Sequence, residues 1–124
     1  MTLIEELEAA TEGSRELDAR IAQAAYPDLR QGGGGLWYLH DVHVRIEPYT
    51  TSIDSALTLV PAGWLWGLHL NDIRDIFGGG LTQAFVREAS DDRAAAYHHA
   101  EAASAALALC IAALKAREQI NDAD

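Results

Sequence analysis

Residues 64–70 constrain the fold most, because they form a hydrophobic segment with a strict two-residue alternation. The sequence there is Trp-Leu-Trp-Gly-Leu-His-Leu, and it is bounded by Pro61-Ala62-Gly63 and by Asn71-Asp72. This alternation predicts a strand. It places Trp64, Trp66, Leu68 and Leu70 on one face, which needs a covering layer. We therefore expect a sheet with both of these tryptophans in its core.

The rest of the chain supplies the other elements of a layered domain. Capping residues and apolar spacing predict helices at 2–12 (capped by Thr2), from Ser14 to about 25, from Thr51 or Ser52 to about 60, and from Ala94 or His98 to Arg117. Aromatic and β-branched residues predict strands at 36–46 and 81–88. This order predicts an α+β fold, a small α/β sandwich. Its central, mostly antiparallel sheet of three to four strands is covered by N- and C-terminal helices.

The length of 124 residues is typical of one domain, here residues 1–124. The single cysteine, Cys110, lies on an apolar helical stripe, which favours a core position in a reducing compartment. No apolar run is long enough for a membrane helix, and Glu5, Glu6 and Glu8 stand where an export signal carries basic residues. We expect a cytoplasmic protein that does not bind a membrane.

The formal net charge of −10 narrows the choice of partners. A chain this acidic repels nucleic-acid backbones at long range, and no basic run offsets the repulsion. We therefore expect no DNA or RNA partner. A small anion is a different case, because two or three local arginines can hold one phosphate while salt screens distant charges within about 10 Å.

A resemblance to a known family covers nearly the whole chain. Its centre is residues 49–64, Tyr-Thr-Thr-Ser-Ile-Asp-Ser-Ala-Leu-Thr-Leu-Val-Pro-Ala-Gly-Trp. This segment resembles the central motif of the phage ABA sandwich family. Residues 105–116 are similar to the closing helix of that family, and residues 7–11 and 14–18 are similar to its opening.

The resemblance implies a bacteriophage or prophage origin and an α/β sandwich, and it implies no catalytic residue. The chain departs from the family at Ala103-Ser104, where members often have Thr-Pro. Residues 32–44 and 72–80 match nothing in the family. We therefore expect function to lie in the segments that depart from the motif, residues 32–45 and 72–87.

Aromatic and basic residues in these two segments suit a nucleotide. Gly32–Gly35 is not a phosphate-binding P-loop, since no Lys-Ser/Thr pair follows it. An indole beside this loop could stack on a base while an arginine pairs with a phosphate. The candidate ligand-binding residues are Trp37, Tyr38, His43, Arg45, Arg74 and Arg87.

Histidines offer a second kind of chemistry. His40, Asp41 and His43 could serve a small hydrolase or a metal ion. On a single strand, however, His40 points away from Asp41 and His43, and a metal needs a further ligand, such as His69 or one of His98 and His99. His98-His99 is expected on a helix surface. We expect no metal and no cofactor.

Three hypotheses for the function follow. The first is a non-enzymatic binding protein, an anti-defence protein that sequesters a nucleotide signal of host immunity. The second is a phage structural or interaction protein that binds another protein through its acidic surface. The third is the hydrolase. We favour the first, and we expect a homo-oligomer because small binding modules often build their sites at subunit interfaces.

Overall fold

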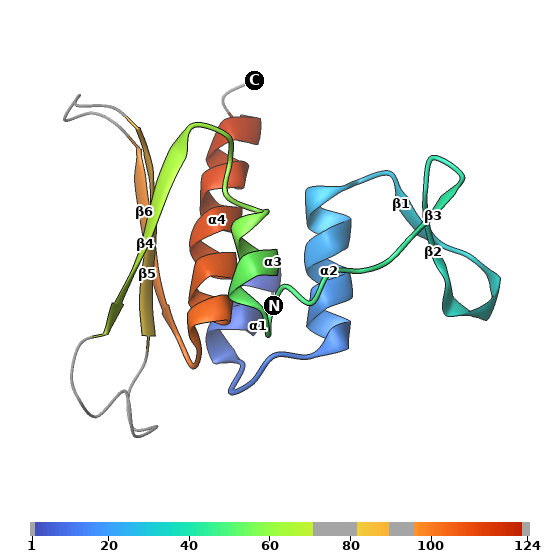
Figure 1. Cartoon of the computed structure of the whole chain (residues 1–124), viewed down its shortest axis with the longest axis horizontal. Coiled ribbons are helices and arrows are strands. Elements are labelled where there is room, and N and C mark those ends of the chain that lie inside the picture. Colours follow the sequence, from blue (N-terminus) through green and yellow to red (C-terminus); the bar gives the residue numbers. More distant parts are fainter. Residues whose placement is uncertain (1, 71–81, 90–95, 123–124) are drawn as a thin grey trace.

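The computed structural model describes residues 2–70, 82–89 and 96–122, and its elements alternate between helices and short antiparallel sheets (Figure 1). In order they are α1 (Leu3–Ala9), α2 (Arg15–Ala25), β1 (Leu29–Gln31), the 3₁₀ turn η1 (Gly33–Gly35), β2 (Trp37–Leu39), β3 (Val42–Val44), α3 (Ile53–Leu57), β4 (Trp64–Leu70), β5 (Thr82–Glu88), β6 (Tyr97–Ala102) and α4 (Ala105–Asp122). The α+β class predicted from the sequence is confirmed. The described residues form two sheets of three strands, where the sequence predicted one sheet.

Helix α4 is the centre of the molecule. It packs on β5 and β6 on one side and against α1 and α3 on the other, and α2 and the sheet β1–β2–β3 lie beyond them (Figure 1). Its residues from Ala106 to Leu114 are all buried, and Leu107, Leu109 and Ile111 are 0% exposed. Each such side chain stabilises the fold by about 1.5–3 kcal/mol. The alanines let the sheet approach the helix closely.

The sheet β4–β5–β6 is antiparallel throughout, and its register decides which side chains face α4. Trp66 pairs with Val86, and Val86 pairs with His98, so these three share the α4 side. Leu65, Arg87 and Tyr97 form the neighbouring row on the outer face. The predicted strands at 64–70 and 81–88 are therefore confirmed.

Three helix starts were predicted correctly. The hydroxyls of Thr2, Ser14 and Ser52 accept hydrogen bonds from the backbone N–H groups of Glu5, Leu17 and Ser55, and these bonds cap α1, α2 and α3. Within the described residues, no helix is long and apolar enough to cross a membrane.

The predicted strand at 36–46 is wrong as a single strand. The chain folds back at His40 and Asp41, which have φ angles of 51° and 67°. Two successive residues with positive φ give the tight turn that matches the twist of an antiparallel hairpin. Trp37 and Leu39 therefore share a face with Val44 and Val42, whereas on one continuous strand odd and even positions would lie on opposite faces.

The predicted start of the last helix is also wrong. Residues 97–102 form β6, and α4 begins at Ala105 after Ser104, whose hydroxyl accepts a hydrogen bond from the N–H of Leu107. Alternation explains the strand, because Ala100 and Ala102 are buried against α4 while Glu101 is exposed. His98 and His99 consequently lie on opposite faces of a sheet and not on a helix.

The tryptophans of β4 also differ from expectation. Trp64 is partly buried against the core, but Trp66 is 44% exposed, so its predicted core position is wrong. Trp66 is exposed because α4 packs on β5 and β6, whereas β4 is an edge strand of the described sheet.

Candidate functional site

The β2–β3 hairpin and the start of α2 border an open cleft of about 300 Å³. We call it the hairpin cleft. Its lining residues come from α2, η1, β2, β3 and the residues directly before β2 and after β3, and they are Arg15, Ala19, Gly35, Leu36, Trp37, His43, Val44, Arg45 and Ile46. Three of the residues predicted from the sequence, Trp37, His43 and Arg45, therefore line one cleft, although the strand register places the His43 side chain with Tyr38 on the opposite face of the hairpin from Trp37.

Trp37 provides the aromatic wall of the hairpin cleft. Its side chain is partly buried and packs against the hydrophobic core, opposite Val44 on β3. This packing holds the indole in place, so that a planar ligand stacked on it costs little further ordering of the protein.

Arg45 provides positive charge. It follows β3 directly, and its side chain is exposed. In the described part of the chain, neither a hydrogen bond nor an ion pair engages its guanidinium. Its guanidinium therefore offers N–H donors that a bound anion could use in pairs.

Arg15 is a second cation at the cleft, and sequence reasoning missed it. Its Nη2 donates to the carbonyl of Ile46 at 2.7 Å, and its Nη1 donates to Asp18 Oδ2 at 3.0 Å. The side chain remains 65% exposed. Only the tertiary contact with Ile46 brings Arg15 to the hairpin, and no local pattern in the first turn of α2 indicates it.

A buried carboxylate fixes the position of α2 beside this hairpin. Asp18 is 0% exposed. Its Oδ1 accepts hydrogen bonds from the N–H of Thr50 at 2.8 Å and from the Thr50 hydroxyl at 2.6 Å. Buried charges of this kind need several donors to be tolerated. The pair therefore joins α2 to the segment that leads into α3.

The glycine-rich turn closes one end of the cleft. Gly34 and Gly35 have φ angles of 73° and 77°, which disfavour any residue with a side chain. Gly32 lies against the Tyr38 ring, since a Cβ on Gly32 would come within 2.8 Å of Tyr38 Cε2. The glycines therefore shape a tight turn beside the site.

The other predicted residues lie elsewhere. Tyr38 is on the opposite face of the hairpin from Trp37, and its ring lies 5.8 Å from that of His43. Arg87 is exposed on the outer face of β4–β5–β6, on the far side of α4 (Figure 1). Arg74 falls outside the described residues.

His40 and Asp41 form the tip of the hairpin, where both are exposed. His40 Nε2 lies 3.6 Å from a carboxylate oxygen of Asp28. His43 lies further along β3, opposite Tyr38. Among the described residues, no group of three or more His, Cys, Asp or Glu side chains is placed to hold a metal ion.

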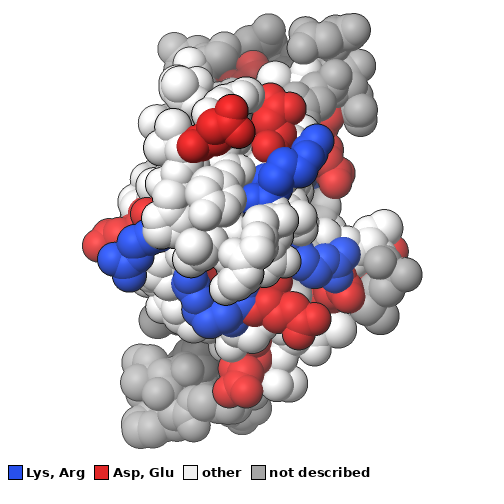
Figure 2. Space-filling view, turned by 90° about the vertical axis from the view of Figure 1, so that its right-hand side faces the viewer, with Lys and Arg blue, Asp and Glu red and all other residues white. Residues whose placement is uncertain are grey.

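The local charge around the hairpin cleft differs from that of the whole chain. Residues 14–47 carry four arginines and five acidic residues, so their net charge is −1, against −10 for the whole chain. Figure 2 shows basic and acidic side chains interspersed around an uncharged central area of this face. Since distant charges are screened, an anion meets less repulsion here than the net charge suggests.

Two buried groups have raised pKa values. Burial raises the pKa of the Cys110 thiol to about 12, and its S–H donates to the carbonyl of Tyr49. Burial also raises the pKa of the Tyr49 phenol to about 12, against an opposing effect of Arg117. Because the thiolate is the nucleophilic form, Cys110 is a core residue, as predicted, and not a reactive one.

Comparison of the chain with models of known protein families, with curated proteins and with solved structures gives no match in any of the three.

Proposed function

We propose that this chain is a non-enzymatic binding protein that holds a small aromatic anion of the nucleotide class in the hairpin cleft. One observation carries the proposal. The fold brings Trp37 and Arg45 into the same cleft of about 300 Å³ and adds Arg15 from α2. An aromatic wall with two neighbouring guanidinium groups is complementary to a base with an attached phosphate.

The chemistry assigns a role to each residue. Trp37 stacks on the base, a contact worth about 1–3 kcal/mol per base in known sites. Arg45 pairs with the phosphate through two parallel N–H donors. Arg15 is already held by Asp18 and Ile46, so it contributes fixed charge and not a new fork of hydrogen bonds.

The size of the cleft limits the ligand. A volume of about 300 Å³ is at the lower end of small-molecule sites. One base and one phosphate suit this volume, and the rest of a larger signal, such as a cyclic dinucleotide, would extend over the surrounding surface.

The biological setting of the proposal rests on the resemblance to phage proteins. A phage protein that holds a nucleotide without changing it can sequester a signal of host immunity in the cytoplasm of the infected cell. Mass action makes such sequestration effective when the protein exceeds the signal in concentration.

We also propose that the chain self-associates through β4. This edge strand has seven residues, and its Leu65, Trp66 and Leu68 are 44%, 44% and 37% exposed. A long apolar edge strand presents unpaired backbone groups that readily pair with another chain. A two-fold antiparallel β4–β4 contact between copies would extend each sheet without further change.

Calorimetric titration with AMP, GMP and cyclic dinucleotides tests the binding proposal. The informative pair of variants is Arg45→Ala and Arg87→Ala, because both remove one exposed arginine and change the net charge equally. We expect Arg45→Ala to weaken binding by about 10- to 100-fold and Arg87→Ala to leave it within about twofold, since one charge-assisted contact is worth about 1.5–3 kcal/mol.

Three results would contradict the proposal. They are no heat of binding with any of these nucleotides, equal weakening by both arginine variants, and conversion of the nucleotide during the titration. Equal weakening would mean that net charge and not the hairpin cleft controls the affinity.

A further inference from the structure

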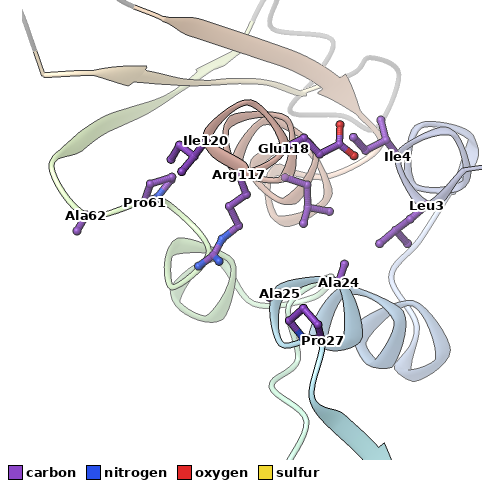
Figure 3. Close-up of a pocket in the computed structure, with 11 residues that line it drawn as sticks. Leu3, Ile4, Ala24, Ala25, Pro27, Pro61, Ala62, Arg117, Glu118 and Ile120 are labelled. Carbon is purple, nitrogen blue, oxygen red and sulfur yellow. The ribbon is translucent and has the colours of Figure 1, made fainter. Parts of the chain in front are cut away.

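A second cavity lies on the other side of α2, at the ends of three helices. It has a volume of about 470 Å³. Figure 3 shows its wall residues, which come from α1, the end of α2, the segment before β4 and the last turns of α4. We call it the helix-end pocket.

The walls of the helix-end pocket are mainly apolar. Leu3 and Ile4 of α1 face it, and Ala24 and Ala25 at the end of α2 are too small to fill the space between the helices. Leu114 and Ile120 of α4, with three residues of proline or alanine type, complete the apolar surface. The volume lies within the range of about 300–1,000 Å³ that small-molecule sites occupy.

The guanidinium of Arg117 is a positively charged group at this pocket. The Nε of Arg117 donates to the carbonyl of Leu59 at 2.6 Å, which holds the guanidinium on the α3 side of the pocket. This bond uses one of five N–H donors. Among the described residues, no carboxylate forms an ion pair with Arg117.

The acidic residue that lines the pocket, Glu118, lies on a different side from the Arg117 guanidinium. Glu118 is exposed and points toward Ile4 of α1, away from the Arg117 guanidinium (Figure 3). The pocket therefore has a guanidinium at one end, a carboxylate on another side and apolar side chains between them. A ligand with one carboxylate and an apolar body is complementary to the guanidinium and the apolar side chains, because a guanidinium fork matches a carboxylate.

We propose that the helix-end pocket binds an aliphatic monocarboxylate of medium chain length, with its carboxylate at Arg117 and its chain between α1 and α2. This site is separate from the hairpin cleft, so neither proposal depends on the other.

Calorimetric titration with hexanoate, octanoate and decanoate, with decanol for comparison, tests the site. We expect the affinity to rise by up to about fourfold per buried methylene until the pocket is full. We expect decanoate to bind at least about tenfold more tightly than decanol, because decanol cannot pair with Arg117.

Three variants locate the site. Ala24 is exposed where it lines the pocket, so Ala24→Trp places an indole across the pocket and should abolish decanoate binding. Gln23→Trp, at the neighbouring exposed position that does not line the pocket, should leave binding unchanged. Arg117→Gln should remove the preference for decanoate over decanol. Circular dichroism of each variant verifies that α4 and α2 remain folded.

The proposal is overturned if decanoate and decanol bind equally, if Ala24→Trp binds decanoate like the unmodified chain, or if no binding of decanoate is detected. A nucleotide titration of Ala24→Trp separates the two sites. Its nucleotide affinity should equal that of the unmodified chain whether or not decanoate binds.

Discussion

Thr50→Val is the substitution that most directly tests how the hairpin cleft is held. Valine has nearly the shape of threonine but lacks the hydroxyl that donates to Asp18 Oδ1 at 2.6 Å. Thr50 is 1% exposed and Asp18 is 0% exposed, so water cannot replace the lost donor. The carboxylate keeps the N–H of Thr50 and the guanidinium of Arg15.

The expected cost follows from these contacts. A hydrogen bond to a charged group contributes about 1.5–3 kcal/mol, and the loss leaves part of a buried charge without a partner. We expect Thr50→Val to lower the free energy of unfolding by about 2–3 kcal/mol. Thr50→Ser keeps the hydroxyl and loses one methyl group, so about 1 kcal/mol is expected.

Urea unfolding followed by circular dichroism measures both values. The dependence of the free energy of unfolding on urea concentration should be the same for both variants, and the urea midpoint should fall further for Thr50→Val than for Thr50→Ser. In a double-mutant cycle with Asp18→Asn, the two substitutions should couple, because they remove the same interaction. If Thr50→Val changes the free energy of unfolding by less than about 0.5 kcal/mol, the Thr50–Asp18 hydrogen bond does not hold α2 in place.

Three further predictions follow from buried and exposed positions. The pKa of Cys110 rises from 9.0 to about 12 on folding, so above pH 9 the unfolded chain binds fewer protons than the folded chain. The free energy of unfolding should therefore fall as pH rises from 9 toward 12. Urea midpoints across this range should fall less steeply for Cys110→Ala, and an equal slope would contradict the assignment. Gly13→Ala should destabilise by about 1–3 kcal/mol in the same assay, since a Cβ there would lie 2.5 Å from the carbonyl oxygen of Thr50, and an unchanged midpoint would contradict this contact. Light scattering of Trp66→Glu should give the monomer mass of 13.4 kDa, whereas the unmodified chain should give a multiple of it, and a monomeric unmodified chain would refute self-association through β4.

Local signals in the sequence were sufficient for the starts of α1, α2 and α3 and for β4 and β5. A capping hydroxyl and an alternating apolar pattern act within a few residues, so Ser14, Ser52 and the segment 64–70 were read correctly. The burial of Cys110 also followed from its own helical stripe.

The two errors in secondary structure have physical causes. His40-Asp41 is a tight turn without the Asn-Gly or Asp-Gly pair that usually marks one, and strand-forming residues flank it on both sides. Residues 97–102 contain alanines and precede an alanine-rich helix, so helix propensity predicted one long helix. Pairing of β6 with β5 and burial of Ala100 and Ala102 against α4 favour the strand.

The candidate site was predicted only in part, because some of its residues are brought together by local structure and others by long-range packing. Trp37, His43 and Arg45 come together because one hairpin turn joins them. Arg15 and Arg87 depend on long-range packing, which placed the first at the hairpin cleft and the second on the other sheet. A single sequence contains no local signal for such contacts.

The central claim is that a nucleotide binds in the hairpin cleft, and an NMR titration with AMP tests it most directly. The chain has three tryptophans, which give three indole N–H signals. We predict that the Trp37 indole signal and the backbone signals of Gly35 and His43 shift together with AMP concentration, while the indole signals of Trp64 and Trp66 stay in place. Shifts confined to β4, or no shifts at all, would contradict the account.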